Sequence, residues 1–208
     1  DSLRSRGLGD VYKRQVGTFT PGIEIWNLDV LNALEPSCVL GGEDTSMADA
    51  IMRHNMMNES DKQRMNNTLT PAKDSSLKIG SHTDAVMSLS WNKVHRQVIA
   101  SGSADCTVKL WDVTQANSDQ ANAGTLRHHT DKVQSVLWHP KEGTLLATGS
   151  YDRTVALVDA RATDNIKQVK IPADCESLAW DPFNPHCLTA ACEDGTVMCW
   201  DVRKFTTK

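Results

Sequence analysis

A hairpin-like segment recurs along the second half of the sequence. Its clearest copy, Ile99–Asp112, reads IASGSADCTVKLWD, in which two short β-favouring runs flank a polar turn and the second run closes on Trp-Asp. Turn residues between two alternating runs are typical of a β-hairpin. Related segments occur at Leu145–Ala160, where Val158 takes the position of Trp111, and at Leu188–Asp201. The repetition restricts the fold to one built from copies of this unit.

A second tryptophan precedes each hairpin and sets the length of the repeat. Trp91, Trp138 and Trp180 each lie twenty residues before the closing position of their unit, and the units are spaced by 47 and then 42 residues. A constant internal spacing with a variable spacer indicates loops of different lengths. A period of roughly 40–45 residues with a closing Trp-Asp is typical of four-stranded WD-repeat blades. We therefore predict an all-β fold, an incomplete WD-repeat β-propeller with about three full blades plus partial blades of a ring of seven.

The repeat divides the chain into four regions. Residues 1–15 begin without Met and show no period, so we interpret them as a non-native or disordered leader, with an internal loop as the alternative. Residues 16–40 are predicted to form a partial blade without its opening strand, 41–79 a disordered insert, and 80–208 three blades plus the start of the next. Because each blade stabilises its neighbour, we expect the chain to be a fragment of a longer protein. Outer strands are expected at Leu34–Leu40, Asn122–Arg127, Ile166–Ile171 and, in part, Val202–Lys208.

The insert at 41–79 does not continue the β pattern. It is rich in Met, Asn, Asp, Ser and Lys, a composition for which disorder is the default inside a β repeat. Ser46 and Asp49 have the spacing of a capping box, so a helix over Ser46–Arg64 is the alternative.

Composition argues against several classes of protein. The net charge of −4 gives no basis for general nucleic-acid or membrane-surface binding. No apolar run approaches the ~20 residues of a membrane-spanning helix. The six cysteines include no CxxC pair, which favours buried, reduced thiols of a cytosolic or nuclear protein over a disulfide framework.

Polar residues recur at fixed places around each hairpin. A buried Trp needs an acceptor for its indole N–H, and a buried Asp needs donors. The spacings match the hydrogen-bonded set of WD repeats, and this resemblance implies a relay from indole to hydroxyl to a neutral imidazole to carboxylate. We expect the first full blade to be the best satisfied and the third the loosest, because the third has Ala190 for the hydroxyl and no matching His. The set comprises His82, Ser101, Asp105 and Trp111 in the first full blade, His129, Thr148 and Asp152 in the second, and Asp194 and Trp200 in the third.

Two chemical alternatives use some of the same residues. His82, Ser101 and Asp105 are the residue types of a Ser/His/Asp catalytic set, but similar residues recur as scaffold in successive repeats, and the sequence has no GxSxG, Walker or HExxH motif. A metal site is the other alternative. Its ligands straddle a hairpin, in which strand alternation separates them. We therefore predict no catalytic residue, no cofactor and no metal, although Cys187, Cys192, Cys199 and His186 are the candidate ligands.

Several longer phrases resemble the periodic tryptophan protein family. The most diagnostic one closes a blade in Ala-Leu-Val-Asp-Ala-Arg instead of Trp-Asp. The similarity covers about 16–208 apart from the insert, which is expected to be basic in the family and is charge-balanced here. The matching phrases are IEIWNLDVLNALEP (Ile23–Pro36), SHTDAVMSLSWNK (Ser81–Lys93), ASGSADCTVKLWDV (Ala100–Val113), HTDKVQSV (His129–Val136) and GSYDRTVALVDAR (Gly149–Arg161).

The resemblance implies a non-catalytic scaffold of the nucleus and nucleolus that acts in ribosome biogenesis, in pre-rRNA processing or rRNA gene transcription. Expected partners are proteins of preribosomal or chromatin assemblies, with RNA bound only indirectly and no membrane or small-molecule substrate. Loops on a rigid platform are the usual binding elements, and the candidate contact residues are Asp84, Lys132, Tyr151 and Glu193. The alternative is a chromatin-reader or ubiquitin-ligase-adaptor propeller that binds a peptide at its central mouth, for which Tyr151 is the candidate cage wall.

Overall fold

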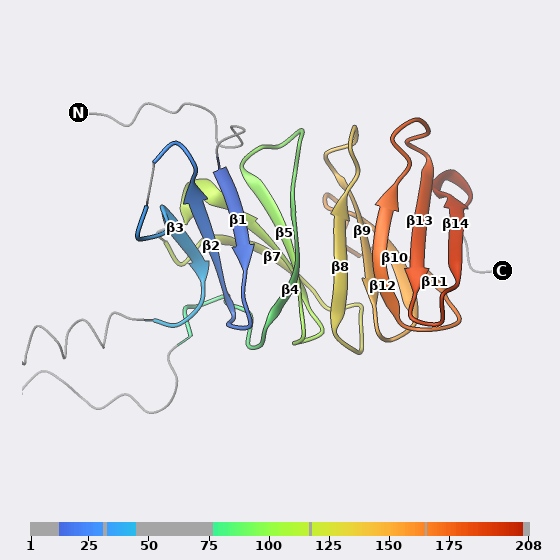
Figure 1. Cartoon of the computed structure of the whole chain (residues 1–208), viewed down its shortest axis with the longest axis horizontal. Coiled ribbons are helices and arrows are strands. Elements are labelled where there is room, and N and C mark those ends of the chain that lie inside the picture. The colour runs from blue at the N-terminus through green and yellow to red at the C-terminus, as the bar shows by residue number, and fades with distance from the viewer. Residues whose placement is uncertain (1–12, 31–32, 45–76, 117, 165, 206–208) are drawn as a thin grey trace, which may run out of the picture.

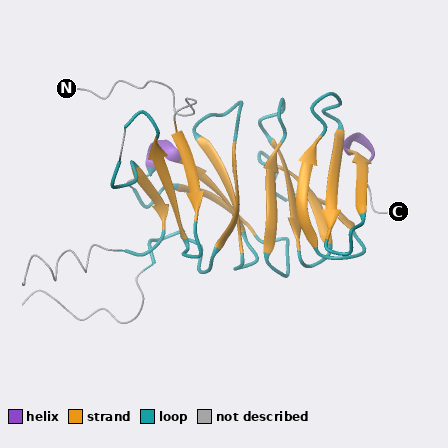
Figure 2. Cartoon of the chain, in the orientation of Figure 1, coloured by secondary structure: helices purple, strands orange, loops and turns teal. Residues whose placement is uncertain are grey.

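The regular structure is almost entirely β. The computed structural model describes residues 13–30, 33–44, 77–116, 118–164 and 166–205. Within these ranges, strands form four antiparallel sheets that stand side by side (Figure 1), and the helical residues are confined to two short 3-10 turns (Figure 2). The all-β WD-repeat architecture predicted from the repeat is confirmed.

Each sheet is a meander of strands consecutive in sequence. The first contains β1 (Lys13–Gly17), β2 (Gly22–Asn27) and β3 (Cys38–Gly41). The second contains β4 (Val86–Trp91), β5 (Val98–Ser103), β6 (Val108–Asp112) and β7 (Asn122–Leu126). The third contains β8 (Val133–Trp138), β9 (Leu145–Ser150), β10 (Thr154–Asp159) and β11 (Ile166–Lys170). The fourth contains β12 (Cys175–Trp180), β13 (Cys187–Cys192) and β14 (Val197–Asp201).

The three repeats share one pairing register. The leading tryptophan ends the first strand of each unit and pairs with the second residue of the next strand, as Trp91 does with Ile99. Trp138 pairs with Leu146 and Trp180 with Leu188 in the same way. Each first strand also has a register shift at its start, between residues 86 and 88, 133 and 135, and 175 and 177. The constant spacing of the tryptophans in the sequence therefore corresponds to the same strand register in each of the three sheets.

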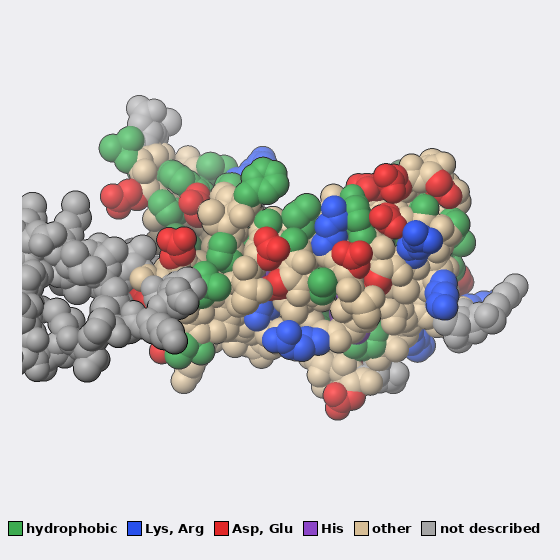
Figure 3. Space-filling view, turned by 90° about the horizontal axis from the view of Figure 1, so that it is seen from below, with side chains coloured by type: hydrophobic (Ala, Val, Ile, Leu, Met, Phe, Trp, Pro, Cys, Tyr) green, Lys and Arg blue, Asp and Glu red, His purple; other side chains and the backbone are tan. Residues whose placement is uncertain are grey.

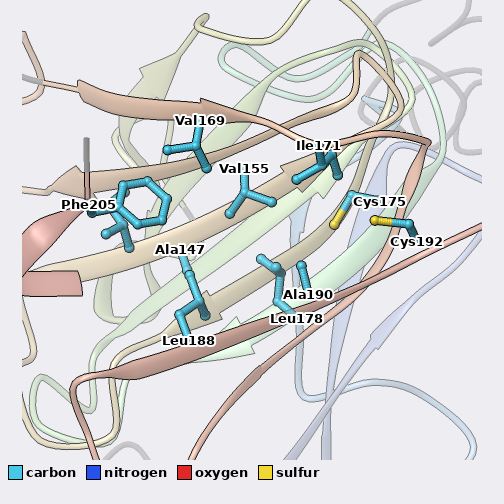
Figure 4. Close-up of a cluster of buried hydrophobic side chains, with 11 residues drawn as sticks. Ala147, Val155, Val169, Ile171, Cys175, Leu178, Leu188, Ala190, Cys192 and Phe205 are labelled. Carbon is cyan, nitrogen blue, oxygen red and sulfur yellow. The ribbon is translucent and has the colours of Figure 1, made fainter. Parts of the chain in front are cut away.

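The hydrophobic core lies between the sheets. One buried cluster joins Ile23 and Leu40 of the first sheet to Ile99 and Trp111 of the second. A second cluster joins the second sheet to the third, and a further one joins the third to the fourth (Figure 4). Each sheet therefore buries its apolar residues only against a neighbour.

Serine side chains connect the first strands of neighbouring sheets. The hydroxyl oxygen of Ser88 on β4 accepts from the backbone N–H of Val136 on β8 at 3.1 Å. The equivalent Ser135 on β8 accepts from the N–H of Leu178 on β12 at 3.2 Å. These contacts satisfy backbone donors that no strand of the same sheet pairs.

The structure departs from the predicted boundaries in several places. β1 begins at Lys13, three residues inside the predicted leader, because this segment pairs with β2. The outer strand expected at Leu34–Leu40 is limited to Cys38–Gly41. Residues 1–12, most of the predicted insert and the alternative helix at 46–64 lie outside the described residues, while Glu43 and Leu77 form an antiparallel bridge.

The strand expected to begin at Val202 is instead a 3-10 turn. Its N-cap, Asp201, accepts from the backbone N–H of Arg203 at 3.0 Å, and Val202–Lys204 form the turn. Asp112 caps the turn at Val113–Gln115 in the same way. In the described part of the chain the fourth sheet therefore has three strands instead of the four expected of a full blade.

Candidate functional site

A continuous relay of hydrogen bonds crosses the second sheet. The indole N–H of Trp111 on β6 donates to Ser101 Oγ on β5 at 2.7 Å. Ser101 Oγ lies 2.7 Å from His82 Nε2, and His82 Nδ1 lies 2.8 Å from Asp105 Oδ2 in the β5–β6 turn. When His82 is a neutral imidazole with its proton on Nδ1, every donor in the chain finds an acceptor.

The carboxylate end of the relay is held by several donors. Asp105 Oδ2 also accepts from the Thr83 N–H, and Asp105 Oδ1 accepts from the N–H and the hydroxyl of Thr107. Burial alone would raise the pKa of Asp105, but the hydrogen bonds from His82, Thr107 and Thr83 together lower it well below its usual range. Asp105 thus stays ionised and anchors the turn.

The same geometry leaves Ser101 unavailable as a nucleophile. The distances between Ser101, His82 and Asp105 are those of a catalytic set. However, Ser101 is 0% exposed, and its oxygen already accepts from the Trp111 indole. The relay therefore connects strands of the sheet and presents no reactive oxygen to solvent.

The third sheet keeps the relay but changes its donor. His129 Nε2 lies 2.9 Å from Thr148 Oγ1, and His129 Nδ1 lies 2.8 Å from Asp152 Oδ2. Val158, in place of the tryptophan, is buried and apolar. His128 Nε2 instead lies 2.9 Å from Thr148 Oγ1 and supplies the missing N–H.

Sequence reasoning missed His128, although the doubled histidine in HHTDK was a signal of it. Burial lowers the pKa of His128 to about 4, and the neighbouring His129 adds to this effect. The hydrogen bonds from His129 and Thr154 outweigh burial and lower the pKa of Asp152 to about 2. His128 therefore serves as a neutral donor at neutral pH.

In the fourth sheet an apolar cluster takes the place of the relay. Ile171 and Ala190 occupy the positions of the imidazole and the hydroxyl, and both are buried in the cluster that also contains Leu178 (Figure 4). Asp194 is exposed and accepts from the N–H of Thr196, whereas Trp200 packs edge-on against Phe205 at 6.0 Å. The structure does not bring Asp194 and Trp200 into one hydrogen-bonded set.

The candidate contact residues lie at one end of the sheets. There each hairpin turn bonds to the loop that enters its sheet, as the Tyr151 N–H does to Lys132 O and the Glu193 N–H to Asp174 O. Asp84, in the loop that enters the second sheet, is exposed and accepts from the Ala85 N–H. Figure 3 views this end, where acidic side chains gather over the fourth sheet with lysine and arginine side chains beside them.

Tyr151 connects the third and fourth sheets at this end. Lys132 Nζ lies 3.7 Å from the centroid of the Tyr151 ring, and the Tyr151 hydroxyl donates to Glu176 Oε1 on β12 at 2.5 Å. The hydrogen bond to Glu176, with burial and the charges of Glu176, Glu193 and Asp174, raises the pKa of Tyr151 to about 12. Glu176 was not among the residues predicted from the sequence.

Carboxylates also surround the neighbouring turn. The pKa of the Cys106 thiol is raised by burial and then by the charges of Asp131, Asp105, Asp152 and Asp84.

In the described part of the chain, no three His, Cys, Asp or Glu side chains are grouped as a metal site. None of the helices in the described ranges has the length and apolar character needed to cross a bilayer.

Comparisons with known proteins agree with this architecture. Periodic tryptophan protein 1 of Saccharomyces cerevisiae is 38% identical over 109 residues, which cover 52% of this chain and 16% of the relative. Its Drosophila melanogaster homologue is 30% identical over 100 residues, covering 48% and 16%. An uncharacterised WD repeat-containing protein of Schizosaccharomyces pombe is 36% identical over 102 residues, covering 49% and 16%. The resemblance to the periodic tryptophan proteins is confirmed, and the alignments span about a sixth of the length of these relatives.

A solved structure and a family model place the fold more generally. A chain in the crystal structure of a mitotic checkpoint complex matches with a TM-score of 0.65 and 21% identity, over 95% of this chain and 46% of its own length, which shows a shared fold. The family model "WD domain, G-beta repeat" matches residues 74–112, 121–159 and 169–201, more than half of the sequence. The chain therefore belongs to the family of WD domain, G-beta repeat proteins.

Proposed function

We propose that the chain is part of a non-catalytic WD-repeat scaffold that assembles proteins of preribosomal particles in the nucleolus, in pre-rRNA processing or rRNA gene transcription. The similarity to periodic tryptophan protein 1 supports this proposal. The relay in the second sheet supports its non-catalytic character, because the Ser/His/Asp constellation formed by Ser101, His82 and Asp105 is buried and holds the sheet together. RNA is bound indirectly, through protein partners.

The proposed binding face is the loop end that carries Asp84, Lys132, Tyr151 and Glu193. Rigid sheets hold these loops in fixed positions, as a binding platform requires. The contact of Tyr151 with Lys132 and Glu176 orders two neighbouring sheets at this end and presents charges of both signs. We propose that a folded protein with complementary charges binds here.

The alternative, a chromatin-reader or ubiquitin-ligase-adaptor propeller, has less support. A reader that binds a cationic side chain needs a free aromatic wall. The ring of Tyr151 is already covered by Lys132, and its hydroxyl is engaged by Glu176.

Affinity purification of the tagged full-length protein from nuclei tests the proposal. We expect preribosomal proteins to co-purify, to remain bound after RNase treatment, and to be reduced at least tenfold by the double variant Tyr151→Ala and Lys132→Ala. Lys93→Ala, at an exposed site on the opposite end of the sheets, is the matched control. Cytosolic staining without preribosomal partners would contradict the proposal.

A further inference from the structure

In the second and third sheets, the residue after the leading tryptophan joins one sheet to the next. In the second sheet this residue is Asn92. Its Oδ1 accepts from the backbone N–H groups of Val94 and His95, which closes the β4–β5 turn. Its Nδ2 donates to Gly143 O in the third sheet at 2.6 Å. One side chain thus accepts within its own turn and donates to the turn of its neighbour.

His139 repeats this arrangement one sheet further along. Its Nδ1 accepts from the N–H groups of Lys141 and Glu142 in its own turn. Its Nε2 lies 2.8 Å from Pro185 O in the fourth sheet, so it donates to that carbonyl. Gly143 and Pro185 both stand five residues after the leading tryptophan of their units. The side chain that donates and the carbonyl that accepts therefore recur at the same positions in successive units.

Asp181 breaks the series in the fourth sheet. Its Oδ1 accepts from the N–H groups of Phe183 and Asn184, as the equivalent atoms of Asn92 and His139 do in their turns. Its Oδ2 consequently takes the place of the atom that donates to the next sheet. A carboxylate only accepts, so a backbone carbonyl at this place would be repelled and left unpaired.

The face of the fourth sheet that carries Asp181 has the residues that form the contact between sheets in the preceding units, but here these residues are exposed. Val197 is 67% exposed, whereas Val108 and Val155 at the same place in the preceding units are 0% exposed. Ser177 is exposed, although the equivalent Ser88 and Ser135 accept backbone N–H groups of the next sheet. The face thus continues the interface seen twice within the chain.

Neighbouring blades of a WD-repeat ring pack against one another, and we infer that the first turn of the sheet that packs on this face presents a lysine or arginine side chain to Asp181 in place of a backbone carbonyl. Phe183, next to Asp181 in the same turn, is 95% exposed. At the same place in the second sheet, Val94 lies against Gly143. Phe183 thus offers an apolar surface to the stem of a basic side chain and a ring face to its charge.

A second residue restricts the shape of the bound sheet. A Cβ at Gly102 would lie 2.8 Å from Val133 Cγ1, and one at Gly149 would lie 2.3 Å from Cys175 Sγ, so glycine allows the close approach of the next sheet. The fourth sheet has Ala191 at this place. The bound sheet must therefore begin its first strand with a small residue or lie farther away.

An extended chain tests the inference. A copy of residues 120–159 added after Lys208 repeats the natural spacing between a closing Asp and the next outer strand, and Ala191→Gly admits the copied Val133. Two such chains are compared, one with the copied Gly143 intact and one with Gly143→Arg in the copy. Pro185, at the same position in the fourth sheet, shows that a residue with a Cβ is accepted there beside the preceding sheet. In each, hydrogen exchange is measured at the copied Val136 amide, which we expect to donate to Ser177.

The inference predicts opposite effects of Asp181→Asn in the two chains. The substitution should slow exchange roughly tenfold where the copy presents a carbonyl, and accelerate it roughly tenfold where the copy presents arginine. In the unextended chain the urea midpoint should not change, because the acceptor Oδ1 remains. Effects of the same sign in both extended chains, no effect in either, or unprotected copied amides in every variant would overturn the inference.

Discussion

At the scale of single residues, the repeated relay position is filled in three different ways. Trp111 supplies the N–H in the second sheet and His128 supplies it in the third. In the fourth sheet Ile171 and Ala190 replace both the imidazole and the hydroxyl, while Trp200 is partly exposed and Asp194 is exposed. Replacing the two buried middle groups together by apolar ones leaves neither of them without its partner, which is why the third way is tolerated.

The two closing tryptophans should differ in their contribution to stability. Trp111 is 1% exposed and donates to Ser101, so Trp111→Phe removes a buried hydrogen bond and leaves a cavity, at a cost of about 2–3 kcal/mol. Trp200 is partly exposed and packs against Phe205, so Trp200→Phe should cost less than about 1 kcal/mol. Urea unfolding of the two variants measures this difference, and equal costs would refute the ranking.

His128 should make the protein less stable in mild acid. Its pKa is lowered to about 4 in the folded state from 6.5, mainly by burial, so the unfolded chain binds a proton first. Stability is then full above pH 6.5 and falls by an amount on the order of 2 kcal/mol as the pH drops to 4. Asp105 and Asp152, whose pKa values are lowered, act only below pH 4.

Urea midpoints measured between pH 7 and pH 4 test this effect. His128→Asn keeps a donor for Thr148 without titrating, and its midpoint should change less over this range than that of the parent chain. His95→Asn, in an exposed turn, is the control and should follow the parent. A parallel decline of His128→Asn and the parent would show that another group is responsible.

At the scale of elements, two of the hairpin turns hold a non-glycine residue at positive φ, a backbone strain that the turn sequences do not predict. The same turn position has φ values of 65° at Cys106, 62° at Arg153 and 83° at Gly195. This left-handed region favours glycine, because it crowds a Cβ against the backbone. The third turn is therefore relaxed, and the first two are not.

Glycine at the strained turns should stabilise the protein. Cys106→Gly is expected to raise the free energy of unfolding by about 0.5–1 kcal/mol, because the left-handed conformation then has no Cβ penalty. Gly195→Ala should lower it by a similar amount, although no atom lies within 4 Å of the added Cβ. Thermal unfolding measures both effects. Destabilisation by Cys106→Gly would mean that the thiol contributes more than the strain costs.

At the scale of the whole molecule, the sheets depend on one another. Each buried cluster takes its side chains from two sheets, as the cluster around Leu146 does from the second and the third. Hydrogen bonds from one first strand to the next strengthen this dependence. A substitution that destabilises one sheet should therefore also destabilise the sheet that packs against it.

A single core substitution should thus loosen two sheets. Leu146→Ala removes a fully buried side chain and is expected to cost about 3 kcal/mol. Native-state hydrogen exchange should quicken to a similar extent in β5 and in β9, and much less in β2. Leu40→Ala is the matched control, and it should affect β2 and β5 instead. A change confined to β8–β11 would show that the sheets unfold independently.

The repeat spacing predicted the strands, their order and their pairing. Strands joined by a short turn pair locally, so the distance from Trp91 to Trp111 already defines a three-stranded meander. The boundaries at Lys13 and Val202 were less predictable. One depends on how far the β1–β2 hairpin continues beyond its turn, and the other on the side chain of Asp201, which caps a turn where a strand was expected.

By itself, the sequence determined the WD-repeat fold, because it follows from a period and from strand pairing within one hairpin unit, while the relay residues were expected from the resemblance to WD repeats. Only the tertiary structure decided that His128 replaces a tryptophan, that Tyr151 is held between Lys132 and Glu176, and that Asp181 stands where its counterparts donate. The physical reason is that the period shows which positions are equivalent, whereas the partner of a side chain that differs from its counterparts depends on which atoms the folded sheets bring within reach of it.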